Sequence, residues 1–123
     1  MLPVTSVLSA VSALALVVLS VSVSLRRMKV DTRIGFGDDP MLMRRIRAQG
    51  NFTEYVPLGL LLTGLTEYRG APVAALYAMA GLLVMGRALH VAGILSGRTA
   101  IRAPGMVCTY SVLLIGAAVL LLG

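Results

Sequence analysis

The sequence predicts an all-α integral membrane protein, folded as a four-helix bundle. Hydrophobic residues make up 58% of the 123 residues and charged residues only 13%, and the mean hydropathy is +0.90. A soluble domain carries about 25% charged residues, so the composition excludes both a soluble globular protein and a disordered chain. The apolar residues also gather in four runs with short polar stretches between them. Four such runs indicate four helices.

Each run is compared with the length of about 20 apolar residues that a membrane-spanning helix needs. The first run, residues 2–25, contains no charged residue, and the third and fourth runs, 71–86 and 103–123, are also free of charge. The second run, 52–66, is shorter and contains Glu54. We therefore expect one domain over residues 1–123 with transmembrane helices at about 3–26, 40–67, 71–96 and 104–122, the second helix entering the membrane near Asn51.

The basic residues predict the orientation in the membrane. The chain has 11 Lys and Arg against 5 Asp and Glu, and nine of the 11 lie in the segments 26–50 and 95–102. Basic loops stay in the cytoplasm, so both segments should be cytoplasmic and both termini should lie on the other side. This pattern explains the net charge better than nucleic-acid binding does.

The first run lacks a basic start and is followed directly by Arg26 and Arg27, which favours a retained helix over a signal peptide.

Polar residues of the second helix indicate a site. Arg44, Arg47, Asn51 and Glu54 recur at spacings of three, four and three residues and so share one helical face, with Tyr55 beside them. A carboxylate inside the membrane costs about 2.5–3.5 kcal/mol on insertion scales, so Glu54 must face protein, water or a ligand. Two interpretations stay open: a polar ligand site at the cytoplasmic membrane edge, or a structural Glu–Arg pair between helices.

The later helices add further polar candidates. Arg87 and His90 lie one turn apart near the end of the third helix, and Arg87 is the natural partner for Glu54. Lipid headgroups are the alternative partner for Arg87, and equally for Arg102, which precedes the fourth helix. With a single histidine and a single cysteine, Cys108, no metal site is predicted.

Thr109 and Tyr110 of the fourth helix are expected to be packing groups. Arginine pairs carboxylates through two parallel hydrogen bonds, while Glu54 suits an ammonium and Asn51 an amide. The site therefore suits a small peptide with two carboxylates and an amino group. A nucleotide or an anionic lipid headgroup also fits this chemistry.

The segment 44–57, RRIRAQGNFTEYVP, contains the pattern R-x-x-R-A-x-x-N-x-x-E-Y and resembles the signature of the MAPEG family, the membrane-associated proteins of eicosanoid and glutathione metabolism. RIGFGDD at 33–39, GRALHVAG at 86–93 and R-x-P-G-M at 102–106 are similar to its small bacterial branch. The resemblance implies a homotrimer with four transmembrane helices per chain and a location in a bacterial inner membrane.

The resemblance also implies a site for glutathione between neighbouring subunits, near the cytoplasmic face. Matched by motif, Arg47, Asn51, Glu54 and Tyr55 would contact glutathione from one subunit, and Arg26, Arg27 and Gln49 from its neighbour. Arg87 and His90 match positions on the third helix, and Arg102 resembles the arginine that activates the thiol. Tyrosines of the family stand where this sequence has His90 and Ile94.

The expected function is that of a glutathione transferase or peroxidase, acting on lipophilic electrophiles or hydroperoxides with glutathione as co-substrate and no metal. The expected partners are further copies of the chain, the bilayer and a lipophilic small molecule, with no nucleic acid. One alternative is a non-catalytic lipid-binding or scaffold member of the same family. Another is a small multidrug exporter, which the sequence disfavours because exporters of that kind place an essential carboxylate in the first helix, and this first helix has no charge.

Overall fold

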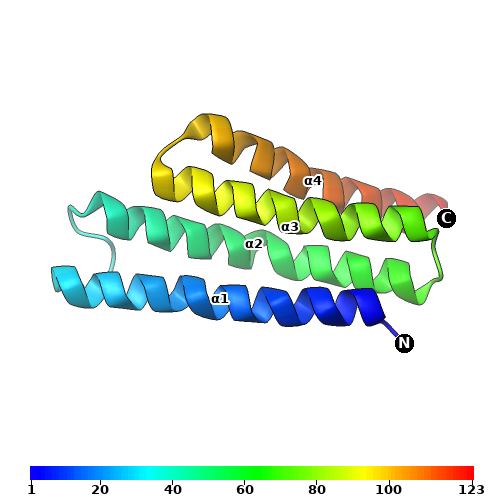
Figure 1. Cartoon of the computed structure of the whole chain (residues 1–123), viewed down its shortest axis with the longest axis horizontal. Helices are drawn as coiled ribbons and strands as arrows, with labels where there is room; N and C mark the ends of the chain where they lie inside the picture. Colours follow the sequence, from blue (N-terminus) through cyan, green and yellow to red (C-terminus); the bar gives the residue numbers. More distant parts are fainter.

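The computed structural model describes residues 1–123 as four helices joined by short connections. Their bounds are α1 Pro3–Val30, α2 Pro40–Tyr68, α3 Val73–Ser96 and α4 Thr99–Leu122. Successive helices run in opposite directions, so both termini lie at one end of the bundle, and the α1–α2 loop and the α3–α4 turn lie at the other (Figure 1). We call the end with the loop and the turn the basic end, because nine of the 11 basic residues belong to the segments that meet there.

The expected all-α class is confirmed, and three of the helices are long and apolar enough to cross a membrane: α1, α3 and α4. The second helix, α2, does not reach that level of hydropathy. Its first half carries Arg44, Arg45 and Arg47, and Glu54 follows about two turns after Arg47. The polar residues that indicate a site in the sequence are also the reason why the hydropathy of α2 is lower than that of the other three helices.

Two helix bounds differ from the sequence expectation. The first helix continues to Val30 instead of ending near residue 26, and its last turn closes through Asp31, which adopts a left-handed conformation with φ 52°. The fourth helix begins at Thr99 instead of 104, so that Pro104 lies inside it. Proline has no N–H group, so Pro104 leaves the carbonyl oxygen four residues earlier, that of Ala100, without a helical donor. Because Ala100 lies in the first turn of the helix and is exposed, the proline is tolerated there.

The α1–α2 loop is held by side chains rather than left open. Asp39 caps α2 by accepting a hydrogen bond from the Leu42 N–H at 2.8 Å. The same carboxylate accepts two hydrogen bonds from Arg26, from Nε at 2.7 Å and from Nη2 at 2.8 Å. Hydrogen bonding by Arg26 lowers the pKa of Asp39 from 3.8 to about 2, against an opposing effect of burial. Arg27 closes the loop further by donating to the carbonyl oxygen of Gly35 at 2.6 Å.

At the other end of the bundle, Glu67 of α2 closes the first turn of α1. Its carboxylate accepts hydrogen bonds from the N–H groups of Val4 at 2.9 Å and Thr5 at 2.8 Å, and from the Thr5 hydroxyl at 2.6 Å. The first turn of α1 contains no acidic residue of its own, and its N-cap residue, Leu2, provides no side-chain hydrogen bond. A carboxylate from a different helix therefore satisfies the N–H groups that every helix leaves open at its start.

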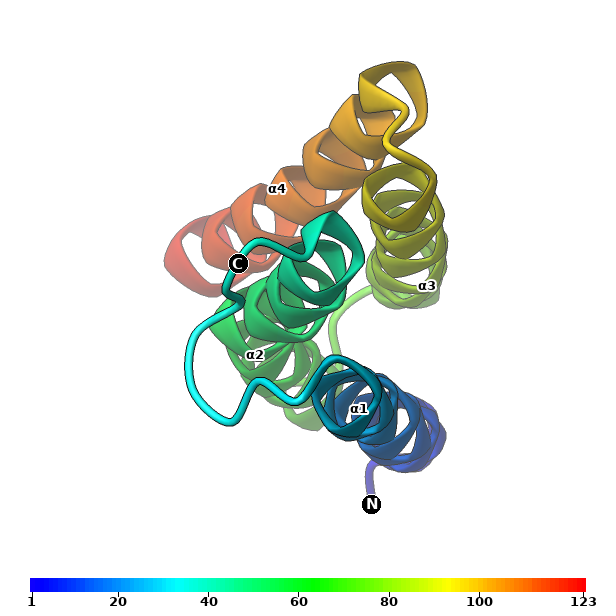
Figure 2. The same cartoon turned by 90° about the vertical axis from the view of Figure 1, so that its left-hand side faces the viewer.

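Seen end-on, α2 lies between α1 on one side and the α3–α4 pair on the other (Figure 2). The core between them contains Phe52 and Val56 of α2, Met79 and Leu83 of α3, and Val112 of α4. The first helix packs mainly on α2, touches α3 only slightly and does not contact α4.

Glycines bring α3 and α4 into backbone contact. A Cβ atom on Gly105 of α4 would lie 2.6 Å from the backbone nitrogen of His90, and one on Gly86 of α3 would lie 2.9 Å from the carbonyl oxygen of Gly105. A Cβ atom on Gly93 would likewise collide with the backbone nitrogen of Arg102. Small residues at such interfaces let membrane helices approach closely. The α3–α4 pair is therefore the most tightly joined part of the molecule.

Candidate binding site at the basic end of the bundle

A cavity of about 230 Å³ opens at the basic end, where α2 begins, α3 ends and α4 begins. Three of its lining residues are arginines: Arg44, Arg47 and Arg102. The other lining residues are uncharged, namely Met43, Gly93, Ile94, Gly97 and Thr99. Three guanidinium groups around one cavity, with no carboxylate in its wall, are chemically suited to an anion.

The local sequence explains how these arginines meet. Arg44 and Arg47 stand one turn apart on α2. Arg102 lies in the first turn of α4, and the glycine contact at Gly93 lets the backbone of Arg102 lie directly against α3. Gly97 ends α3 with φ 75°, and any side chain there would meet the guanidinium of Arg44 at 3.0 Å. Two glycines thus make room for two of the three charges.

Glu54 pairs with Arg47, and both lie on the exposed face of α2. The Arg47 nitrogens Nη1 and Nη2 each donate to Glu54 Oε1 at 3.4 Å. The two side chains are 51% and 50% exposed. The expected pairing of Glu54 with Arg87 within the chain is therefore wrong. The spacing of residues along α2 puts Glu54 on one side of the helix with Asn51, but Asn51 is buried and bonds to Arg87, whereas Glu54 stays half exposed.

Arg87 instead forms hydrogen bonds that link three of the four helices. Its side chain is 6% exposed, and its nitrogen Nη1 donates to Asn51 Oδ1 at 2.5 Å. The second nitrogen, Nη2, donates to Thr109 Oγ1 at 2.8 Å, and the Thr109 hydroxyl in turn donates to the Gly105 carbonyl oxygen at 2.9 Å. One guanidinium group thus links α2, α3 and α4. Asn51 and Arg87, which the resemblance assigns to glutathione, are joined to each other by one hydrogen bond.

Two tyrosines and a histidine surround this linkage. The rings of Tyr55 and Tyr110 meet edge to face with their centroids 5.8 Å apart. The guanidinium carbon of Arg87 lies 6.0 Å from the centroid of the Tyr55 ring, within reach of a cation–π interaction. His90 is buried against α4, and its Nδ1 atom has no hydrogen-bond partner. Tyr55 is half-buried and Tyr110 is exposed, so the pair of rings lies at the surface of the bundle.

The residues that the resemblance assigns to a neighbouring subunit lie away from the cavity. Arg26 is bound to Asp39, and Arg27 to the α1–α2 loop. Gln49 donates to Ser20 Oγ on α1 at 3.3 Å. None of the three lines the cavity of the same chain.

Two residues of this region have no role in the set that the resemblance implies. Arg44 lines the cavity, as its place one turn before Arg47 on the polar face of the second helix indicates. Thr109 was expected only to pack, yet it receives a hydrogen bond from Arg87. Nothing in the spacing of the sequence marks that contact, because the two residues lie on different helices. No three His, Cys, Asp or Glu residues lie together in a group that could hold a metal ion.

The comparisons with known proteins agree with this architecture. The model of the MAPEG family matches residues 5–122. Similar relatives include the inner membrane protein YecN of Escherichia coli strain K12 and that of Escherichia coli O6:H1. Each is 30% identical over 103 residues, which cover 82% of this chain and 79% of the relative. No solved structure matches the chain. The length of the family match and the three apolar helices make it a membrane protein, and the chain belongs to the MAPEG family.

Proposed function

We propose that this protein binds glutathione at the basic end of the bundle and activates its thiol toward lipophilic electrophiles or hydroperoxides. The observation that carries the proposal is the cavity lined by Arg44, Arg47 and Arg102 without an acidic residue. Glutathione offers two carboxylates, one ammonium and one thiol. Arginines suit the carboxylates, and the exposed Glu54 beside Arg47 suits the ammonium.

Arg102 is the residue proposed to activate the thiol. It is exposed in the first turn of α4, at the rim of the cavity. A thiol with a pKa of about 8.5 is only a few per cent ionised at neutral pH, and lowering that pKa by one unit needs about 1.4 kcal/mol. A neighbouring guanidinium supplies such stabilisation. The thiolate sulfur then forms a bond to the electrophilic carbon, and the leaving group departs with the electron pair of the bond that breaks.

We also propose that the chain assembles as a homotrimer. The outward face of α2 lies between α1 and α4, which do not contact each other (Figure 2). That face is apolar at Leu58, Leu61 and Leu65, all of which are exposed. Covering it with neighbouring copies would bring Arg26, Arg27 and Gln49 of one chain toward the site of another, as the resemblance implies.

The proposed topology has four membrane passes in a bacterial inner membrane, with the basic end in the cytoplasm and both termini outside. It is tested with single cysteines at Asp38 and Arg69, in a chain whose own Cys108 is replaced by alanine. An impermeant maleimide should label the Arg69 position from the periplasm and the Asp38 position only after the membrane is opened. Labelling of both positions in intact cells would contradict the orientation.

The proposed division of roles is tested by calorimetry and by thiolate absorbance on the purified protein. Arg47→Ala should weaken glutathione binding but largely keep the turnover at saturation, because it removes a carboxylate contact. Arg102→Ala should bind nearly normally but need a higher pH to ionise the thiol. Arg98→Ala is the matched control, because Arg98 is exposed beside the cavity without lining it. The same pure binding defect in both variants would contradict the division.

The second candidate function is that of a non-catalytic lipid-binding or scaffold member of the family. An apolar groove between α1 and α3, separate from the arginine cavity, favours it. Absence of thiolate absorbance and of conjugation with a reactive aryl halide in the wild-type protein would support this candidate over the enzyme. Glu54→Gln should weaken glutathione binding only if the first proposal is correct.

A further inference from the structure

Two of the three arginines that line the cavity at the basic end have no acceptor in the chain. Arg47 donates to Glu54, whereas Arg44 and Arg102 take part in none of the side-chain hydrogen bonds or ion pairs of the chain. Arg44 is half-buried and Arg102 is exposed. A guanidinium group in a cavity wall without a protein acceptor keeps its donors for a ligand. Because the proposed function gives Arg102 the thiol, Arg44 is left with no role.

The arginines nearest to the cavity on α1 and α2 already have acceptors. Arg26 donates to both oxygens of the Asp39 carboxylate, at 2.7 and 2.8 Å. Arg27 donates to a carbonyl oxygen of the α1–α2 loop at 2.6 Å, and Arg45 to a carbonyl oxygen of α1 at 3.0 Å. A ligand that takes any of these arginines breaks a contact that the fold uses, and the same contacts exist in every copy of the chain.

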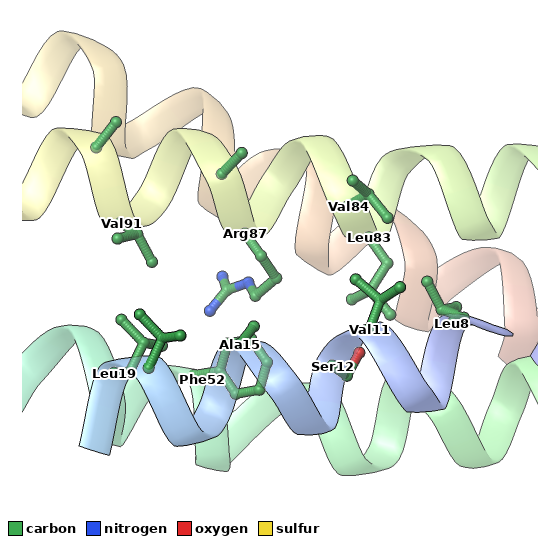
Figure 3. Close-up of a pocket in the computed structure, with 13 residues that line it drawn as sticks. Leu8, Val11, Ser12, Ala15, Leu19, Phe52, Leu83, Val84, Arg87 and Val91 are labelled. Carbon is green, nitrogen blue, oxygen red and sulfur yellow. The ribbon is translucent and has the colours of Figure 1, made fainter. Parts of the chain in front are cut away.

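Arg87 is also engaged elsewhere. It is 6% exposed and donates to Asn51 and Thr109. Figure 3 shows its side chain directed from α3 into the interior of the bundle, toward Phe52. It lines the apolar groove between α1 and α3 and does not line the arginine cavity. Arg44 is therefore the one arginine of the cavity wall that neither the fold nor the proposed function occupies.

Charged groups follow one another along α2 in a fixed order. Glu54 comes seven residues after Arg47, about 10.5 Å along the helix axis, and Arg44 comes one turn before it. Glu54 lies outside the cavity, whereas Arg47 and Arg44 line it. The cavity, at about 230 Å³, is smaller than the roughly 300–1,000 Å³ of pockets that enclose a whole ligand. It is therefore suited to one end of a tripeptide, and the other end would lie along the exposed pair of Arg47 and Glu54.

Glutathione carries its charges in a matching order. The ammonium and one carboxylate share a carbon at the γ-glutamyl end, the thiol is in the middle, and the second carboxylate belongs to the glycine at the far end. We propose that Arg44 binds the glycyl carboxylate, an assignment that rests on the proposed function. The γ-glutamyl end lies at Glu54 and Arg47, and the sulfur lies at Arg102. Arg44 then determines specificity, because it selects thiols that carry an acid at both ends.

The contact is tested by calorimetry on the detergent-purified protein, with glutathione and its glycyl ethyl ester as the two ligands. The wild type should bind the ester about tenfold more weakly, as expected when a hydrogen bond to a charged group is lost. Arg44→Gln should bind glutathione about tenfold more weakly than the wild type and bind the two ligands equally. A wild type that binds both equally, or an Arg44→Gln variant that still prefers glutathione tenfold, would overturn the assignment.

Two further variants separate the contact from general charge and from misfolding. Arg98→Gln removes the same charge beside the cavity, where Arg98 is exposed and not in the wall, and should keep the tenfold preference. Loss of the preference in this control would overturn a specific contact. Arg44→Lys carries the test if Arg44→Gln does not fold. Lysine keeps the charge but cannot form two parallel hydrogen bonds, so the preference should fall below tenfold, and an unchanged preference would overturn the role of Arg44.

Two modified ligands test the orientation and separate it from thiol activation. N-acetylglutathione lacks the ammonium, so its weaker binding should disappear in Glu54→Gln and persist in Arg44→Gln; the reverse result would overturn the orientation. S-methylglutathione has no thiol to ionise, and its preference over its own glycyl ester should depend on Arg44 in the same way. If the wild type binds neither glutathione nor S-methylglutathione, the proposed function and the role of Arg44 both fail. If it binds both with an ester preference that ignores Arg44, only the role of Arg44 fails. The expected ester preference without thiolate absorbance would confirm Arg44 and contradict thiol activation.

Discussion

The α3–α4 pair and the first helix are held in the molecule by opposite means. The pair is joined along its length by backbone contact at Gly86 and Gly105 and by the hydrogen bond from Arg87 to Thr109. The first helix is fixed by polar contacts at its two ends, to Glu67 at one and to Asp39 at the other. Between those ends it packs on α2 and borders a groove.

The difference separates two kinds of surface. The arginine cavity is built partly on the closely joined pair, which can hold charged groups in fixed positions. The apolar groove lies between that pair and the helix with the fewest neighbours, where a wall can adapt to the shape of a lipophilic molecule. Variants that act on one region and spare the other test whether the two are independent.

The largest expected effect follows from removing the linkage inside the pair. Arg87→Leu leaves Asn51 without its donor in the core and should lower the free energy of unfolding by about 2–3 kcal/mol. Arg47→Leu breaks only a half-exposed pair with Glu54 and should cost less than about 1 kcal/mol. Unfolding of the detergent-solubilised protein measures both. Equal costs would mean that Arg87 does not hold the helices together.

A slightly smaller effect tests the glycine contacts. Gly105→Ala forces a Cβ atom to 2.6 Å from the His90 backbone nitrogen and should destabilise the protein by about 1–3 kcal/mol through overpacking. Gly81→Ala is the matched control, because nothing lies within 4 Å of its added Cβ. The control should be stabilised by about 0.5–1 kcal/mol, since alanine is the better helix former. Opposite signs in thermal unfolding confirm the contact, and equal signs contradict it.

A local effect is expected at the start of α1. Glu67→Gln removes the charge that the N–H groups of Val4 and Thr5 bind. Amide hydrogen exchange at these two residues should accelerate several-fold, while exchange in the middle of α3 stays unchanged. Glu54→Gln is the control, because Glu54 caps no helix. Faster exchange throughout the bundle would show that α1 is more closely tied to α3 and α4 than its contacts indicate.

The smallest expected effect is a pH dependence of the α1–α2 loop. Because the pKa of Asp39 is lowered from 3.8 to about 2, its pairing with Arg26 stabilises the fold above pH 3.8 and is lost as the pH falls through about 2. Arg26→Gln should move the pKa of Asp39 back toward 3.8, as followed by the carboxyl carbon signal in NMR. Arg33→Gln, an exposed arginine of the same loop, should leave it unchanged.

Much of the fold follows from the sequence because hydropathy and charge act locally. Four apolar runs predicted four helices, and the chain forms four. The start of α4 was placed too late, because Pro104 reads as a boundary in the sequence. A proline close to the start of a helix breaks few hydrogen bonds, so it did not end this one.

The candidate site was less predictable, because it depends on which helix faces meet. Spacing on α2 put Arg44, Arg47, Asn51 and Glu54 on one side, but it did not show that Asn51 bonds to Arg87 in the core while Glu54 stays exposed. The partners of Arg87 are Asn51 and Thr109, which are 36 and 22 residues away along the chain. Only the close approach of α3 and α4 at their glycines brings Thr109 within reach.

The contact at Glu67 also bears on how the protein is made. The N–H groups of Val4 and Thr5 find their acceptor 63 and 62 residues further along the chain. When α1 leaves the ribosome, the residue that completes its first turn has not yet been translated. The first helix therefore acquires its finished end only when the second helix has folded back beside it. During biosynthesis, α1 and α2 are completed together as a hairpin rather than one after the other.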